Sequence, residues 1–505
     1  MLDRLEKWKT RYGTADATGL ERLLRAAGGS RFQDADSLIR LHECALFFRA
    51  YAPSREAARL ADEILFSFAG RVAGVEDSSP FEEPEVSGIA GTSFSAVFSY
   101  EVARRLLARY PRNVSIDWEN YDRSEKLGPV LRRFLPLVRE DWPVEAHVPY
   151  RQWIEAARPK NGTDLGWLLE QIGRLEWSER DKADLYDSLE LLLLWRMGNI
   201  RTTRSRLRLP VRKMFYHTGP LLRRSGISLQ HEMQSPPLPI RRLARAEACK
   251  ILELILDTSA MRYRELYGFT YPDAERVFHA AAGRGVDFYF FGVPPEWRLP
   301  LRAYLGGMFF KNGVPAGYVE VLSLFERAEV GFNLYYTFRD GETAWLYARL
   351  LRLFRQVLGA RCFSVDPYQI GLENDEAIES GAFWFYRKLG FRPLDADAVR
   401  LVEREEQRMR GQAGYRSSRG TLEKLARSYL LFECADADRG AWDHFRIRKL
   451  ALRCTAENAA EPVLGSFVPD VDELMRAKQG PDEARYLRLM QRHPQLRKAV
   501  IRAGS

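Results

Sequence analysis

The fold of this chain is decided by one stretch, Glu329-Val-Gly-Phe-Asn-Leu-Tyr-Tyr-Thr-Phe338, which is followed by Arg339-Asp-Gly-Glu342. The first part is rich in aromatic and β-branched residues, which is typical of a strand. From Glu342 the apolar residues recur at helical spacing as far as Leu358, and Gly359 follows where a helix-ending glycine belongs. The sequence therefore predicts a strand, a tight turn and a helix.

Further strands are predicted on both sides of this stretch. The β-rich runs 305–310 and 316–325 are separated by Lys311-Asn-Gly-Val-Pro315, and an Asn-Gly pair in that position is a strong hairpin signal. A short strand is predicted at 361–366. Hairpin, strand, helix and strand in this order predict a mixed sheet with helices on its faces.

The turn at 339–344 is a candidate anion site. A turn from a strand into a helix directs unpaired backbone N–H groups and the positive end of the helix dipole at one point, which suits a pyrophosphate. The alternative is an ordinary strand-to-helix connection that binds no ligand.

A second motif follows, in which Asn374 precedes Tyr386-Arg-Lys-Leu-Gly-Phe391. Together with Arg339-Asp-Gly-Glu-Thr-Ala344, it resembles the GNAT superfamily of acyl-CoA-dependent N-acetyltransferases, over about residues 300–395. The resemblance implies a GNAT-like mixed β-sheet flanked by helices, an α+β or α/β fold. It also implies an N-acetyltransferase that takes acetyl-CoA or another acyl-CoA and transfers the acyl group to an amine.

The resemblance also implies roles for particular residues. Tyr386 would protonate the departing thiolate, although it could equally be a core tyrosine beside Phe383 and Phe385. Glu329 or Glu320 would be the base that deprotonates the amine, although each is a residue type that is often simply solvated or paired. The residues that would bind CoA are Phe338, Arg339, Asp340, Gly341, Glu342, Thr343, Ala344 and Asn374.

Two further functions stay open. Glu342 stands where the family has its first glycine, so a carboxylate would face the pyrophosphate, and this favours an inactive acyl-CoA sensor or interaction scaffold. The segment between Asn374 and Tyr386 is also longer than the family's. An aminoacyl-tRNA-dependent transferase of related fold is the other alternative, favoured by a basic segment earlier in the chain.

That basic segment, 196–250, carries thirteen Lys and Arg against two Glu and is interrupted by prolines. It is interpreted either as a strip that contacts phosphates of RNA or CoA, or as a solvated connector. The domain prediction follows these shifts in composition: a helical domain at 1–195, the connector at 196–245, the GNAT-like domain at 246–400, and a helical, basic extension at 401–505.

Composition restricts the class of protein. With 505 residues, 46% hydrophobic and 29% charged, the chain can bury more than one core. The net charge of +9 favours an acidic partner without requiring one. None of the five cysteines forms a CxxC pair, and the seven histidines match no triad or zinc motif, so we expect no metal and a reducing cytoplasmic location. No run reaches the roughly 20 apolar residues of a membrane span.

Overall fold

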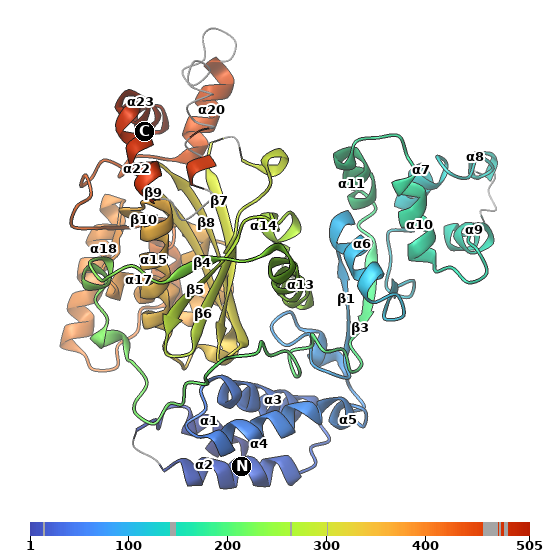
Figure 1. Cartoon of the computed structure of the whole chain (residues 1–505), viewed down its shortest axis with the longest axis horizontal. Coiled ribbons are helices and arrows are strands. Elements are labelled where there is room, and N and C mark those ends of the chain that lie inside the picture. The colour runs from blue at the N-terminus through green and yellow to red at the C-terminus, as the bar shows by residue number, and fades with distance from the viewer. Residues whose placement is uncertain are drawn as a thin grey trace.

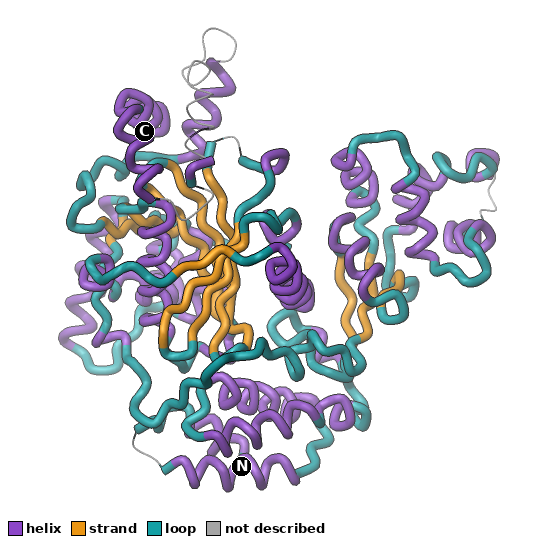
Figure 2. The backbone as a smooth tube through the Cα atoms, in the orientation of Figure 1, coloured by secondary structure: helices purple, strands orange, loops and turns teal. Residues whose placement is uncertain are grey.

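The computed structural model describes residues 1–13, 16–141, 148–262, 265–299, 301–457, 473, 476–478 and 483–505. A large mixed sheet with helices on both faces occupies the centre (Figure 1). The N-terminal helices form a layer at one end of this sheet, and a smaller lobe stands to its side (Figures 1 and 2).

The central sheet has nine strands in the order β11-β12-β10-β9-β8-β7-β6-β5-β4. Every neighbouring pair is antiparallel except β9 and β10, which are parallel. The predicted runs 305–310, 316–325, 329–338 and 361–366 overlap four adjacent strands, β7 to β10, which confirms the mixed sheet. The third strand is shorter than predicted, since β9 ends at Leu334 and Tyr336–Phe338 form a 3-10 turn. The strands are β4 (Ile240–Arg242), β5 (Val277–Gly283), β6 (Val286–Phe291), β7 (Ala303–Lys311), β8 (Val314–Leu324), β9 (Arg327–Leu334), β10 (Cys362–Val365), β11 (Arg392–Pro393) and β12 (Leu430–Glu433).

The predicted hairpin turn is present between β7 and β8. Asn312 and Gly313 both have positive φ, 49° and 80°, which is the backbone of a two-residue hairpin turn. The turn is buried against the N-terminal helices, where Asn312 Nδ2 donates to the Ala50 carbonyl at 2.7 Å. The tip of the hairpin is therefore a contact between the sheet and the N-terminal layer.

Successive side chains of β7 point to opposite faces of the sheet. Leu305 and Phe309 share a core with α15 (Thr343–Leu358), which ends at Gly359 with φ 62°, as predicted. Met308 and Phe310 face a second core formed by α13 (Arg245–Met261) and α14 (Tyr267–Thr270). The sheet is thus covered by helices on both faces.

The N-terminal helices share the core of α15. Each of α2, α3 and α4 begins at a side-chain cap, Asp16, Asp34 or Ser54, which accepts a bond from the first turn. The helices of this layer are α1 (Leu2–Trp8), α2 (Ala17–Gly29), α3 (Ala35–Ala50), α4 (Arg55–Phe66) and α5 (Phe68–Val72).

The prediction that residues 1–195 are all helical is wrong, because the side lobe contains a three-stranded sheet in the order β1-β3-β2. The leucine-rich run at 191–195, which lies within the predicted helical domain, forms most of β3, because a run this short carries no decisive period. The elements of the lobe are β1 (Ser93–Val97), α6 (Tyr100–Arg109), β2 (Val114–Ile116), α7 (Leu127–Leu131), α8 (Val138–Asp141), α9 (Tyr150–Ala157), α10 (Asp164–Gly173), α11 (Glu179–Asp187) and β3 (Leu192–Arg196).

The extension predicted as helical at 401–505 consists mainly of helices in the part that the structure describes, but it also contains a strand. The segment 421–434 divides into the end of α19 (Arg419–Leu425) and strand β12. Because β12 lies between β10 and β11, the extension completes the sheet. The other helices of this half are α12 (Leu229–Met233), α16 (Asp375–Ser380), α17 (Ala382–Lys388), α18 (Ala396–Gly411), α20 (Ile447–Glu457), α22 (Glu483–Arg492) and α23 (Pro494–Gly504).

Within the described residues, no helix has the length and apolar character needed to cross a membrane.

Asp257 on α13 joins the side lobe to the central sheet. Its carboxylate is fully buried and accepts from Arg109 Nη2 at 3.0 Å and from the Tyr110 hydroxyl at 2.5 Å, while Arg105 Nη1 lies 3.7 Å away. All three partners belong to α6 or the residue that follows it. Removing this carboxylate would leave two arginine side chains without their shared buried partner.

We expect Asp257→Ala to lower the free energy of unfolding by about 3 kcal/mol, because breaking a buried charge pair from one side is strongly destabilising. Glu253→Ala is the matched control. Glu253 lies one turn away and also pairs with Arg109, at 2.8 Å, but its side chain is 53% exposed, so we expect a change within about 0.5 kcal/mol. Urea denaturation measures both changes in the free energy of unfolding. Equal changes for the two variants would contradict the conclusion that Asp257 holds the side lobe to the central sheet.

Candidate active site

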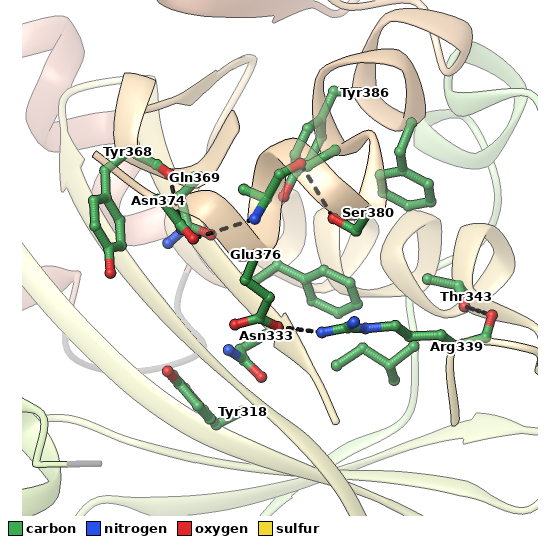
Figure 3. Close-up of a pocket in the computed structure, with 15 residues that line it drawn as sticks. Tyr318, Asn333, Arg339, Thr343, Tyr368, Gln369, Asn374, Glu376, Ser380 and Tyr386 are labelled. Atoms are coloured by element: carbon green, nitrogen blue, oxygen red, sulfur yellow. Dashed lines mark hydrogen bonds and ion pairs between the residues drawn. The ribbon is translucent and has the colours of Figure 1, made fainter. Parts of the chain in front are cut away.

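A cavity of about 320 Å³ opens where β9 and β10 separate. The two strands pair only between residues 327–329 and 362–364, so the rest of β9 runs on without a partner from β10. Residues 332–334 of β9 line one wall, and the turn after β10, with α16 and α17, lines the other (Figure 3). The unpaired edge of β9 leaves backbone N–H and C=O groups available to a ligand.

Tyr386 lies on the helical wall of this cavity, on α17 (Figure 3). Its ring packs against Tyr347 and Phe391, with centroids 5.4 and 5.6 Å away, and the residue is only 3% exposed. Burial raises the pKa of the phenol, which therefore stays protonated. The sequence left open whether Tyr386 is a core residue or a site residue. In the structure it is both, because its ring packs in the core and the residue also lines the cavity.

The wall opposite Tyr386 is polar and comes from the sheet. Tyr318 on β8 is the cross-strand partner of Asn333 on β9, and both line the cavity (Figure 3). Gln369 lies over Gly331, where a Cβ would be 3.8 Å from Nε2. Asn374 also lines the cavity, but its side chain is occupied: Oδ1 accepts from the Ala377 N–H at 3.2 Å, which caps α16.

A second cavity, of about 420 Å³, lies over the start of α15. Of the predicted phosphate residues, Arg339, Asp340, Gly341, Thr343 and Ala344 line it, and Arg339 and Thr343 also line the first cavity. Three further cations, one directly after α1 and two in the connector, also line it: Lys9, Arg223 and Arg224. Four cations against the single carboxylate of Asp340 make this cavity positive.

Glu342 does not face either cavity, so the expectation that its carboxylate opposes a phosphate is wrong. The side chain is 1% exposed and turns beneath the helix start, where it accepts from Arg284 Nε at 2.9 Å and from the Leu222 N–H at 3.0 Å. Lys311 Nζ lies 4.0 Å away, and burial lowers the pKa of this lysine to about 7, an effect that the Glu342 carboxylate opposes. Phe338 is likewise buried, under Tyr51.

The two predicted bases lie beside the first cavity and do not line it. Glu329 pairs with Arg302 at 3.1 Å and lies 3.6 Å from Arg327. Glu320 accepts a bond from the Tyr304 hydroxyl at 2.6 Å, and burial raises its pKa. Because Glu320 is the cross-strand partner of Gly331, it shares a sheet face with Tyr318 and Asn333.

Several lining residues were not identified from the sequence as site residues. Arg223 and Arg224 belong to the basic connector, for which contact with the phosphates of CoA was one interpretation, but no pattern singled them out. Lys9 and Glu376 carry no local signal, because their place at the site depends on how distant segments pack. Within the described ranges, no group of His, Cys, Asp and Glu has the arrangement of a metal site.

Comparison with known proteins gives no further guidance, since no family model, no curated protein and no solved structure matches the chain.

We expect Glu342→Gln to destabilise the protein by about 3 kcal/mol, because Arg284 and the fully buried Lys311 lose their common counter-charge. Asp340→Asn, two residues away, is the control. Its carboxylate is 56% exposed and 3.9 Å from Lys9, so we expect a change of about 0.5 kcal/mol or less. Thermal and urea unfolding of both variants test this, and a stable Glu342→Gln protein would refute the buried pairing.

Proposed function

We propose that this protein is an N-acyltransferase that uses acetyl-CoA or another acyl-CoA and acylates an amine. The observation that carries the proposal is the pair of adjoining cavities, one basic and one with an unpaired strand edge and Tyr386. Arg339, Thr343 and Phe385 line both, so the two adjoin along the start of α15.

Acyl-CoA has a chemical layout that fits this pair of cavities. Its phosphates would lie among Lys9, Arg223, Arg224 and Arg339, near the N–H groups at the start of α15. Its pantetheine arm carries two amides, which can pair with the free backbone edge of β9 beyond Glu329. The thioester would then lie near Tyr386. This is also the placement that the GNAT resemblance implies, and it supports that fold for the central sheet.

The reaction is direct transfer. The nitrogen of a neutral amine attacks the thioester carbonyl, a tetrahedral oxyanion forms, and its collapse breaks the C–S bond and releases the thiolate. The Tyr386 hydroxyl donates a hydrogen bond to that sulfur. Because the raised pKa of the phenol lies above that of a thiol, this bond stabilises the thiolate without requiring complete proton transfer.

The amine must lose a proton before or during attack, and Glu320 is the better placed of the two predicted bases. Both carboxylates share the sheet face of Tyr318 and Asn333, but Glu329 is held by two arginines, whereas Glu320 accepts from the Tyr304 hydroxyl and has a pKa raised by burial. A base with a pKa nearer neutrality is better matched to this task than an ordinary carboxylate. Glu320 would act through water, since it does not line the cavity itself.

Neither of the two predicted bases, Glu320 and Glu329, lines the cavity, and this favours one alternative, an inactive acyl-CoA sensor. The sensor and the enzyme share the CoA site and differ only in turnover. Binding of acetyl-CoA without transfer to any member of a broad amine panel would favour the sensor.

Arg223→Ala should weaken the binding of CoA about fivefold, because one exposed charge-assisted contact to phosphate contributes about 1 kcal/mol. Arg212→Ala is the control, since Arg212 is an exposed arginine of the same connector that does not line the basic cavity. Isothermal titration calorimetry with CoA measures both. Failure of the unaltered protein to bind CoA would refute the proposed function.

Tyr386→Phe should reduce turnover by a factor on the order of 10² or more, with little change in acetyl-CoA affinity, because only the hydroxyl near the sulfur is lost. Tyr347→Phe is the control. Tyr347 packs against Tyr386 in the same ring cluster but does not line the cavity. Free thiol released from acetyl-CoA reports the rate, and equal rates for Tyr386→Phe and the unaltered protein would assign Tyr386 to the core alone.

A further inference from the structure

We propose that the acceptor is a diamine, held through its non-reacting ammonium group by Glu85 and Glu376, and that this clamp becomes available when CoA takes Arg339. The inference rests on the proposed function and adds to it a substrate class and an order of binding.

The clamp consists of two carboxylates that share one arginine. Glu376 extends from α16 into the first cavity and forms an ion pair with Arg339 (Figure 3). Glu85 belongs to the acidic loop that precedes β1, and its Oε1 lies 3.6 Å from Arg339 Nη2. Burial, followed by the neighbouring Glu376, raises the pKa of Glu85, whereas Arg339 and Arg262 act in the opposite direction.

Arg339 has a second possible partner. It lines the basic cavity as well as the first one, beside Lys9, Arg223 and Arg224. A phosphate bound there would compete with the two carboxylates for the same guanidinium. When the phosphate wins, Glu376 at the cavity and Glu85 beside it lose the guanidinium that they share, while Arg262 still acts on Glu85. A new cation beside Glu376 then becomes favourable.

An independent feature indicates that a ligand occupies this place. The Tyr386 side chain is only 3% exposed and lines the same cavity as Glu376, and its hydroxyl forms no hydrogen bond with any residue that the structure describes. The hydroxyl oxygen itself stays accessible, unlike that of the neighbouring Tyr347, so it opens onto the cavity with its hydrogen bond free for a ligand.

The chemistry of transfer indicates a diamine and not a simple amine. The attacking nitrogen must be uncharged, so a pair of carboxylates would hold a simple amine in its unreactive, protonated form. A diamine separates the two requirements: one ammonium pairs with Glu85 and Glu376, and the other nitrogen loses its proton and reaches the thioester near Tyr386. The remaining polar wall, with Asn333 and Gln369, suits such a polar chain.

Calorimetry on the full chain tests the clamp, with diaminobutane and butylamine as the probes, each with and without saturating CoA. We expect diaminobutane to bind at least tenfold more tightly in the presence of CoA. Butylamine, whose single ammonium can also pair with the carboxylates, should bind in the same way but should not be acetylated when acetyl-CoA replaces CoA, whereas diaminobutane should be. In Arg339→Ala the carboxylates are already free, so diaminobutane should bind without CoA. Glu376→Gln should weaken its binding about tenfold, whereas Glu379→Gln, an exposed residue of the same helix, should not.

The outcomes separate the inference from the function on which it rests. If CoA binds but diaminobutane does not, or if butylamine is acetylated as fast as diaminobutane, the diamine clamp is refuted and the acyltransferase proposal stands. If CoA does not bind at all, the proposed function fails, and Arg339→Ala still tests the clamp directly. No binding of diaminobutane to a folded Arg339→Ala protein, with circular dichroism as the check on folding, would overturn the inference.

Discussion

The parallel pairing of β9 with β10 ends at Glu329, and the architecture of the candidate site follows from this separation. Beyond that point β9 keeps its partner β8 but loses the one on its other edge. Backbone polar groups are rarely left unpaired in a protein interior, so the free edge must face solvent or a ligand. The cavity lies at this edge, and α15 begins close to its end, so strand edge and helix start open onto connected space.

A second constraint acts at the start of α15. The positive end of that helix is already balanced from beneath by the buried carboxylate of Glu342, which Arg284 and the connector hold in place. The N-terminal layer and connector therefore fix the helix start and also supply Lys9, Arg223 and Arg224 above it. This explains why Glu342 can stand where the GNAT motif that the sequence resembles has a glycine: the carboxylate links the sheet to its surrounding segments, and the cations lie on the other side of the turn.

The sequence predicted the parts of this structure that local patterns determine. The Asn312-Gly313 turn, the strands around it and the helix ending at Gly359 all follow from backbone propensities and short-range periodicity. Strand β12 and the lobe strand β3 escaped prediction because short apolar runs have no distinguishing period, and long-range pairing decided their form. In the site, Tyr386 belongs to a recognisable motif, whereas Lys9 and Glu85 are ordinary charged residues whose function is set by packing alone.

Arg339 lines both cavities, and it has more negatively charged partners than one guanidinium can neutralise. Its guanidinium can neutralise the carboxylates of Glu85 and Glu376 or a phosphate in the basic cavity, and each choice changes the charge that the other region presents. Coupling of this kind is reciprocal: if a bound phosphate strengthens the binding of a cation, the cation strengthens the binding of the phosphate by the same factor. Acyl-CoA and the diamine would then each bind most tightly when the other is bound. Acyl-CoA alone would be held more weakly, which disfavours hydrolysis of its thioester while the diamine is absent.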